Sequence, residues 1–235
     1  MPALHYTDGD ALCEGHVALP SGTGPHPAVV IFHNWAGQGP HEVAAAERLA
    51  AQGYAAIAAD IYGAGVRGEV FGDNSALMDP WMVDRAGLRT RILAAVAAAA
   101  AHPAVDPDRI AVMGYCFGGL CALDAARSAD PRVRGAVSFH GSYSPPTIGA
   151  QAPITAKVLV LHGWTDPVCP PDATVALAHE LEAAGADWQI HAYGQTGHAF
   201  TAPGLNNRAA GMFYHPDADR RSWRAMTDFL DEVFG

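Results

Sequence analysis

Strand-length apolar runs alternate with helix-forming segments along most of the chain. Residues 27–32 and 54–59 are uninterrupted apolar runs, which are typical of parallel strands covered on both faces. Further strands are predicted at 109–113, 135–139, 157–161 and 188–193, with helices at 42–52, 83–101, 120–127, 172–184 and 217–233. This order predicts an α/β fold, in which a mostly parallel, doubly wound sheet has helices on both faces.

Two stretches depart from this alternation. Cys13 to Leu19 alternates apolar and polar residues, which predicts a half-exposed strand at an antiparallel edge. Residues 64–80 are rich in Gly, Asp and Asn and predict a long loop, of a length that is usually functional or mobile. The sequence contains no internal repeat or linker, so we expect a single domain over residues 1–235.

Cys116 lies in Gly114-Tyr115-Cys116-Phe117-Gly118, between a predicted strand and a predicted helix. This is the context of a nucleophile elbow, a strained turn that lifts one reactive side chain above the end of a sheet. Gly114 and Gly118 stand where larger side chains would collide as the chain reverses. The helix N-terminus would favour a Cys116 thiolate. The alternative is that Cys116 is a buried structural thiol.

Asp166 and His198 each lie in a loop that directly follows a predicted strand. In sheets of this kind, ligands bind outside the carboxyl ends of the strands. The order Cys116, Asp166, His198 is the order nucleophile, acid, base of an α/β-hydrolase. Thiol attack needs an imidazole that takes and returns a proton and a carboxylate that fixes its tautomer. Taken singly, Asp166 also fits an ordinary turn, and His198 is one of 12 histidines.

Five motifs carry a family resemblance. They are Gln-Gly-Tyr-Ala-Ala at 52–56, Asp-Ile-Tyr-Gly at 60–63, Gly-Tyr-Cys-Phe-Gly-Gly at 114–119, Leu-His-Gly-Trp-Thr-Asp-Pro-Val at 161–168 and Gly-His-Ala-Phe at 197–200. Together they resemble the dienelactone hydrolase family of α/β-hydrolases. The resemblance implies the α/β-hydrolase fold, with Cys116 as nucleophile, Asp166 as acid and His198 as base. It also implies a carboxymethylenebutenolidase-class hydrolase of small esters or lactones, which forms a thioester acyl-enzyme without a cofactor.

The resemblance extends to the groups around the reacting carbonyl. It implies that the backbone N–H groups of Trp35 and Phe117 form an oxyanion hole, where two donors would stabilise the tetrahedral intermediate. The candidates for the substrate pocket are Asn34, Tyr115, Trp81 and Phe200.

Two features depart from the family pattern. The prototype has a glutamate that takes the thiol proton, where this chain has Asn34. An amide cannot take that proton, so we expect His198 to activate Cys116 directly; Glu42 is a poor substitute because it lies eight residues further on, in a predicted helix. The arginines that hold the dienelactone carboxylate are also absent from their family positions, which favours a neutral or different ester, lactone or thioester. Arginines elsewhere that could reach the pocket are Arg67, Arg85, Arg89 and Arg208.

Charge and composition indicate which classes of binding partner to expect. The 14 basic and 24 acidic residues give a net charge of −10, which argues against nucleic acid or an anionic membrane as a partner. The N-terminus lacks the pattern of a signal peptide and no apolar run has the length of a membrane span, so a cytoplasmic location is the default. Cysteine and histidine spacings predict reduced thiols and no metal. A small-molecule ester or lactone is the expected partner, and the resemblance implies a monomer.

Other functions stay open on the sequence. A ligand-binding or redox-sensing protein without catalytic activity could use the same fold and a reactive Cys116, because a fold does not fix a function. An acyltransferase or thioesterase would form the same acyl-enzyme, and the sequence does not distinguish hydrolysis from transfer to another acceptor.

Overall fold

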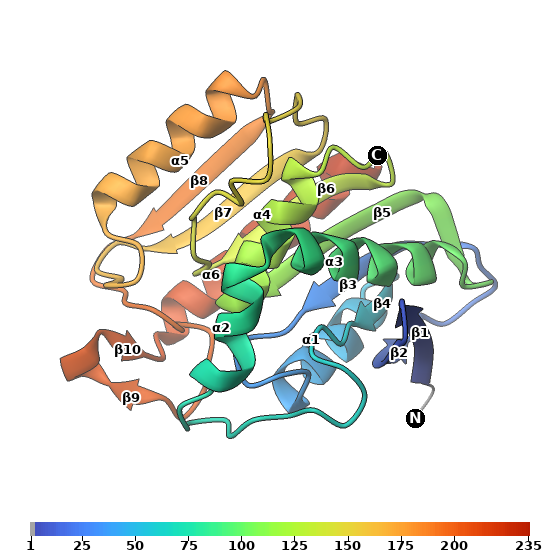
Figure 1. Ribbon diagram of the computed structural model, residues 1–235, viewed down its shortest axis with the longest axis horizontal. Helices are drawn as coiled ribbons and strands as arrows, with labels where there is room; N and C mark the ends of the chain where they lie inside the picture. Colours follow the sequence, from blue (N-terminus) through green and yellow to red (C-terminus); the bar gives the residue numbers. More distant parts are fainter. Residues whose placement is uncertain (1–2) are drawn as a thin grey trace.

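The computed structural model describes residues 3–235, so the first two residues of the predicted domain lie outside it. Eight strands form one sheet in the order β1-β2-β4-β3-β5-β6-β7-β8, with β1 and β8 at opposite edges (Figure 1). The strands are β1 (Ala3–Asp8), β2 (Ala11–Ala18), β3 (His26–Phe32), β4 (Ala55–Ala58), β5 (Val105–Tyr115), β6 (Val133–Phe139), β7 (Lys157–Gly163) and β8 (Trp188–Tyr193). Neighbours from β4 to β8 are parallel, whereas β2 pairs antiparallel with both β1 and β4. The predicted α/β fold class is confirmed.

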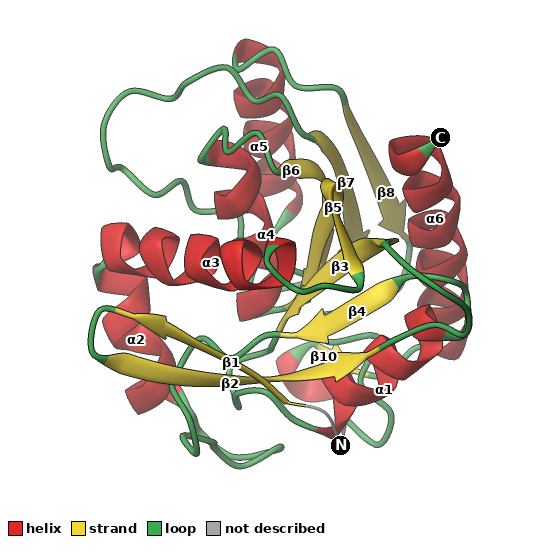
Figure 2. Ribbon diagram, turned by 90° about the vertical axis from the view of Figure 1, so that its right-hand side faces the viewer, coloured by secondary structure: helices red, strands yellow, loops and turns green. Residues whose placement is uncertain are grey.

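Helices cover both faces of the sheet (Figure 2). One face carries α1 (Pro40–Ala50) and α6 (Pro216–Phe234), and the other carries α3 (Arg85–Ala100), α4 (Phe117–Arg127) and α5 (Pro171–Ala183). Successive side chains of a strand point to opposite faces, so Val30 packs in one core and Val29 and Ile31 in the other. Two cores on one sheet explain why residues 28–32 of β3 and all of β4 are apolar.

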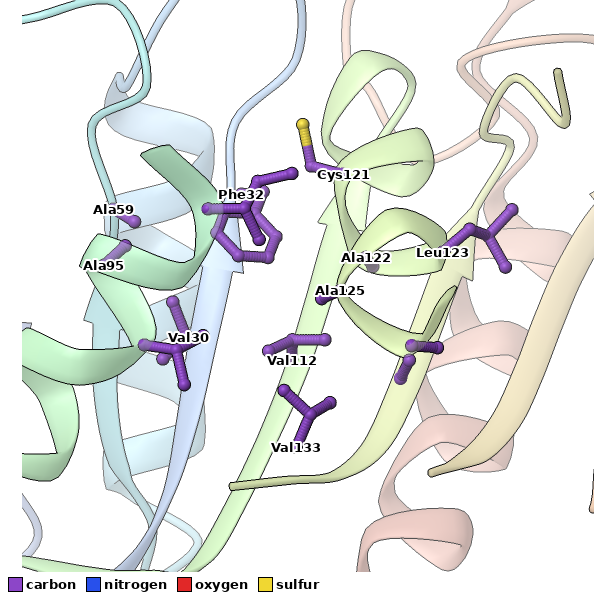
Figure 3. Packing of buried hydrophobic residues seen from close by; sticks show 14 of the residues in the cluster. Val30, Phe32, Ala59, Ala95, Val112, Cys121, Ala122, Leu123, Ala125 and Val133 are labelled. Carbon is purple, nitrogen blue, oxygen red and sulfur yellow. The ribbon is translucent and has the colours of Figure 1, made fainter. Parts of the chain in front are cut away.

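Small side chains let the helices approach the sheet closely. Between α3, α4 and the central strands, Ala95 and Ala125 pack near Val30 and Val112 (Figure 3). All four are fully buried. Burying a valine side chain contributes about 1.5–3 kcal/mol to folding, so this alanine and valine layer fixes α4 and the elbow that precedes it.

The structure differs from the prediction around the long loop. Helix α2 (Ser75–Val83) begins inside the region expected to be a loop, and a non-helical Asp84 separates it from α3, whereas one helix from residue 83 was expected. The Asp84 side chain accepts a hydrogen bond from the Gly87 N–H, so it caps α3 and interrupts the helical path. Strand β1 and the short hairpin of β9 (Asn206–Asn207) and β10 (Met212–Phe213) were also not predicted. Among residues 3–235, no helix is both long and apolar enough to cross a membrane.

Candidate active site

Cys116 occupies a strained turn between β5 and α4. Its φ of 57° and ψ of −113° are unusual for a residue with a side chain, and its N–H donates to the Phe139 carbonyl oxygen at 3.0 Å. A Cβ atom at Gly114 would lie 2.1 Å from the Gly118 oxygen, and one at Gly118 would lie 2.1 Å from the Phe32 oxygen. The turn therefore requires both glycines, as the elbow interpretation predicts, and it leaves Cys116 partly exposed.

Asp166 and His198 form a buried hydrogen-bonded pair. The loop after β7 places the Asp166 Oδ2 atom 2.8 Å from Nδ1 of His198, which follows β8. The other oxygen, Oδ1, accepts the N–H of Val168 at 2.7 Å and that of Cys169 at 3.4 Å. Both carboxylate oxygens are thus acceptors, so Nδ1 of His198 carries the donated proton and Nε2 is the nitrogen available for proton transfer.

Backbone hydrogen bonds hold these two loops together. The Thr165 N–H donates to the Thr196 oxygen at 3.0 Å, which joins the loop after β7 to the loop after β8. The His198 N–H donates to the Gly211 oxygen at 2.8 Å, and His198 forms an isolated bridge with Met212 in the unpredicted β9–β10 hairpin. The position of the imidazole is therefore fixed from two sides.

The environment of His198 favours its protonated form. Burial alone would lower the pKa of His198, but the Cys116 sulfur and the Asp166 carboxylate outweigh it and raise this pKa to about 10. The effect of the Cys116 sulfur on this pKa is larger than that of the Asp166 carboxylate. Cys116 and Asp166 therefore both influence the charge of His198.

We expect His198 to keep both ring protons well above neutral pH. The free histidine pKa is near 6.5 and the folded one is about 10, so the stabilisation from this pair is complete below about pH 6.5 and is lost as the pH rises through 10. Titration of ring nitrogen signals by NMR should show the midpoint far above 6.5 in the wild type and a lower one in Cys116→Ala. A wild-type midpoint near 6.5 would contradict this coupling.

The backbone N–H groups of Trp35 and Phe117 are the predicted oxyanion donors. Among the residues that the structure describes, neither Trp35 nor Phe117 donates its N–H to an acceptor. Phe117 is the first residue of α4, where a helix leaves its N–H groups free. At Trp35 it is the carbonyl oxygen that has a partner, because the Tyr62 hydroxyl donates a hydrogen bond to it. Both groups are available to a bound oxygen.

A protein family and several known proteins match this chain. A model of the Dienelactone hydrolase family matches residues 13–234. The chain belongs to this family. It is similar to the structure of a dienelactone hydrolase-like promiscuous phosphotriesterase, P91, from metagenomic libraries, with a TM-score of 0.90 and 34% identity over 100% of this chain and 98% of that one. It is also similar to a structure named m3DLH, with a TM-score of 0.91 and 36% identity over 100% of this chain and 98% of that one. The Caenorhabditis elegans protein K02A2.1 is 34% identical over 154 residues, which are 64% of this chain and 98% of that protein.

Family membership confirms the resemblance stated from the sequence and makes the protein a hydrolase of the ester and lactone class. Three of the four arginines considered as substitutes for those of the family contact other residues. The Arg85 guanidinium pairs with Asp124 at 2.7 Å, and Arg67 pairs with Asp60 at 3.3 Å. Arg208 lies over the Phe213 ring at 4.3 Å. Arg89 lines a separate cavity of about 180 Å³ with Arg127 and Glu180.

The predicted pocket residues have different positions. Asn34 is half-buried beside Trp35, and Trp81 is half-buried on α2, where the Arg91 guanidinium lies 5.0 Å from its ring. Tyr115 is 3% exposed and Phe200 is 0% exposed, both within a hydrophobic core. Such complete burial leaves no surface for a substrate, so we correct the assignment of these two: they pack beneath the site.

The other cysteines differ from Cys116. Cys13, Cys121 and Cys169 are free and buried, and burial raises the pKa of each thiol, for Cys169 to about 12. They are therefore poor nucleophiles. Within residues 3–235, no group of three or more His, Cys, Asp and Glu side chains has an arrangement that could hold a metal ion.

Glu42 contacts the loop after β3, which its position in the sequence did not indicate. It lies in the first turn of α1 with a fully buried carboxylate, and it binds Asn34. Its distance along the chain argued against a role as proton acceptor, yet helix α1 returns it to the loop after β3. The signal present in the sequence is a glutamate three residues after Gly39, which is capping-box spacing at a helix start.

Proposed function

We propose that the protein hydrolyses small, uncharged carboxylic esters or lactones through a thioester formed on Cys116. The observation that carries the proposal is the coupling of a partly exposed elbow thiol to His198, whose Nδ1 is held by Asp166 at 2.8 Å. Family membership supports the reaction class. The buried Cys13, Cys121 and Cys169 offer no comparable nucleophile.

In the first half of the reaction, His198 holds the proton of Cys116 and the thiolate attacks the carbonyl carbon. A carbon–sulfur bond forms, and the carbonyl oxygen becomes an oxyanion that accepts the N–H groups of Trp35 and Phe117. Each such donor contributes roughly 3–4 kcal/mol to stabilising the transition state. The carbon–oxygen bond then breaks, and the His198 imidazolium gives its proton to the leaving oxygen, which in a lactone stays attached to the acyl group.

In the second half, water replaces the alcohol. His198 takes a proton from the water as it attacks the thioester carbon, and the same two N–H groups stabilise the second oxyanion. The carbon–sulfur bond breaks, the carboxylic acid leaves, and Cys116 again shares its proton with His198. Asp166 keeps the imidazole in one tautomer and stabilises its positive charge throughout.

The ion pairs of two of the candidate arginines favour an uncharged substrate. Arg67 and Arg85 form ion pairs with Asp60 and Asp124, so neither guanidinium is free to bind a substrate carboxylate. Phosphotriesters are uncharged electrophiles too, and the similar protein P91 is named a promiscuous phosphotriesterase. We propose them as a second substrate class. The Cys116 thiolate would form a bond to phosphorus as one phosphorus–oxygen bond breaks, His198 would give its proton to the leaving oxygen, and water would then displace the sulfur to release a phosphodiester.

Mass spectrometry of the intact protein tests the acyl-enzyme. After brief mixing with p-nitrophenyl acetate, the wild type is expected to gain one acetyl group and to release p-nitrophenol in repeated turnovers. Cys116→Ala should do neither, while Cys121→Ala, which changes a buried thiol close by in the chain, should keep the adduct. Release from diethyl p-nitrophenyl phosphate, measured with the same variants, tests the second substrate class.

Three outcomes would contradict the proposal. An adduct on another residue would move the nucleophile away from Cys116. A Cys116 adduct that persists in water but transfers to an added alcohol or thiol would indicate an acyltransferase. No adduct and no turnover with several activated esters, together with selective oxidation of Cys116 by peroxide, would favour a redox sensor.

A further inference from the structure

The loop after β3 satisfies nearly all of its backbone polar groups internally. The Gly37 N–H donates to the Asn34 oxygen at 3.2 Å, the Gly68 N–H donates to the Ala36 oxygen at 2.8 Å, and Tyr62 Oη donates to the Trp35 oxygen at 3.0 Å. The N–H groups of Asn34 and Ala36 are bound as well. From 34 to 37, Trp35 alone keeps an N–H without an acceptor among the described residues. The loop therefore offers one donor and holds the rest of its backbone fixed.

Glu42 holds this loop through Asn34. Its Oε1 atom accepts the Asn34 side-chain Nδ2 at 2.9 Å and the Asn34 backbone N–H at 3.3 Å. The Asn34 Oδ1 atom in turn accepts the Ala36 N–H at 2.8 Å. The Asn34 side chain thus connects the Glu42 carboxylate to the residue that follows Trp35, and the two residues flanking the free donor are both fixed.

We propose that Glu42 is a positioning residue for acyl transfer, which acts through Asn34 to hold the Trp35 N–H where the oxyanion forms. This inference rests on the proposed function. It also gives Asn34 a role that suits its chemistry: an amide cannot take the thiol proton, but it can donate to a carboxylate and accept from a backbone N–H at the same time.

A simpler role for Glu42 is that it only caps helix α1. Its Oε2 atom accepts the Gly39 N–H at 3.1 Å, which is half of a capping box. A cap alone needs one carboxylate oxygen and no contact with Asn34. In this protein the other oxygen, Oε1, accepts two hydrogen bonds from Asn34 in the loop after β3. The carboxylate is also fully buried. Burying a carboxylate costs free energy, and a solvent-exposed glutamate could cap the helix without that cost.

Ionisation of the Glu42 carboxylate should change kcat with pH if Glu42 positions the oxyanion donor, whereas a residue that only caps the helix should not. Burial raises the pKa of Glu42 to about 7, so its ionised form, the better acceptor, is lost as the pH falls through neutrality. Tyr115, at the end of β5, interacts with the charge of Glu42, and burial raises the pKa of Tyr115 above its usual range, so this phenol stays uncharged near pH 7. The histidines next in sequence to the connected pair are His33, before Asn34, and His41, before Glu42. Burial lowers the pKa of each to about 4, so both stay uncharged near pH 7 as well.

The test compares kcat and KM for p-nitrophenyl acetate between pH 5.5 and 8.5. Glutamine is an isostere of the protonated carboxyl, so Glu42→Gln is expected to lower kcat about tenfold or more at pH 8, with KM within about twofold, because a misplaced oxyanion donor acts on the transition state. The wild-type step in kcat near pH 7 should be absent in this variant. Glu47→Gln, an exposed change on the same helix, is the matched control and should keep the step.

A second variant keeps the inference falsifiable if Glu42→Gln folds poorly. Asn34→Ala leaves the Gly39 cap in place and should lower kcat to a similar extent. The double variant should lose no more than the worse single one, because both changes break the same connection. The inference would be overturned if the loss of kcat in the double variant equalled the product of the two single losses, or if the step in kcat near pH 7 survived in Glu42→Gln. Turnover that survives in Cys116→Ala would instead overturn the proposed function, whereas Cys116-dependent turnover unaffected by Glu42→Gln would overturn this inference alone.

Discussion

Asp166→Asn is expected to lower kcat for ester hydrolysis by about 10⁴-fold with little change in fold. In the wild type, Oδ2 accepts from His198 and Oδ1 accepts from the Val168 N–H at 2.7 Å. An asparagine has one oxygen for these two donors. If the oxygen keeps Val168, the amide NH2 faces Nδ1 of His198 and forces the proton onto Nε2, the nitrogen that has to take the proton of Cys116.

Steady-state kinetics with p-nitrophenyl acetate, together with circular dichroism, would measure this effect. Asp172→Asn is the matched control, because Asp172 is an exposed carboxylate in the first turn of α5 and should change kcat by less than about twofold. A kcat for Asp166→Asn within tenfold of the wild type would remove Asp166 from the proton-transfer chain. The same result with an intact acetyl adduct would leave Cys116 as nucleophile.

Gly118→Ala is expected to destabilise the protein by at least about 3 kcal/mol or to prevent folding. The new Cβ would lie 2.1 Å from the Phe32 oxygen and 2.7 Å from the His33 oxygen, which are backbone atoms at the end of β3 and at the start of the loop that carries Trp35. Backbone in the centre of a packed sheet cannot withdraw, so β3 and the elbow would have to separate. Any folded fraction should also lose activity, because the separation moves Cys116 relative to the Trp35 N–H.

Urea denaturation followed by fluorescence would measure the loss of stability. The control is Gly194→Ala, in the loop before His198, where a Cβ would meet nothing within 4 Å and the φ is not positive. That change should alter the free energy of unfolding by less than about 1 kcal/mol. A Gly118→Ala variant as stable as Gly194→Ala would mean that the elbow can open without cost, contrary to the close contact described above.

The sequence predicted the parts of the protein that depend on local order. Apolar runs such as 27–32 have to be strands because each is buried on both faces, and the small residues around Cys116 indicate a turn that only they can form. The position of Asp166 and His198 after two strands predicted that they would share one edge of the sheet, and the 2.8 Å contact lies there.

Features that depend on tertiary contacts were not predictable in this way. Helix α2 begins in a segment of low helix propensity and is stabilised by packing against α3, which the sequence pattern does not show. Glu42 joins the site because α1 folds back beside the loop after β3, so its contact with Asn34 crosses eight residues without any periodic signal. Tyr115 and Phe200 were named as pocket candidates, but both side chains are buried in a hydrophobic core, which depends on how the helices pack.

The contacts between the loops of Asp166 and His198 limit which segments can be changed to alter substrate preference. Besides the Thr165 hydrogen bond, a Cβ at Gly163 would meet the Gly197 oxygen at 2.4 Å, so the acid and base loops form one rigid block that admits no insertion. Residues 64–67 and 206–210 are exposed, and both segments border this chemistry through hydrogen bonds of their neighbours. Libraries aimed at substrate preference belong in these two exposed segments, because changes there leave the hydrogen bonds between the acid and base loops intact.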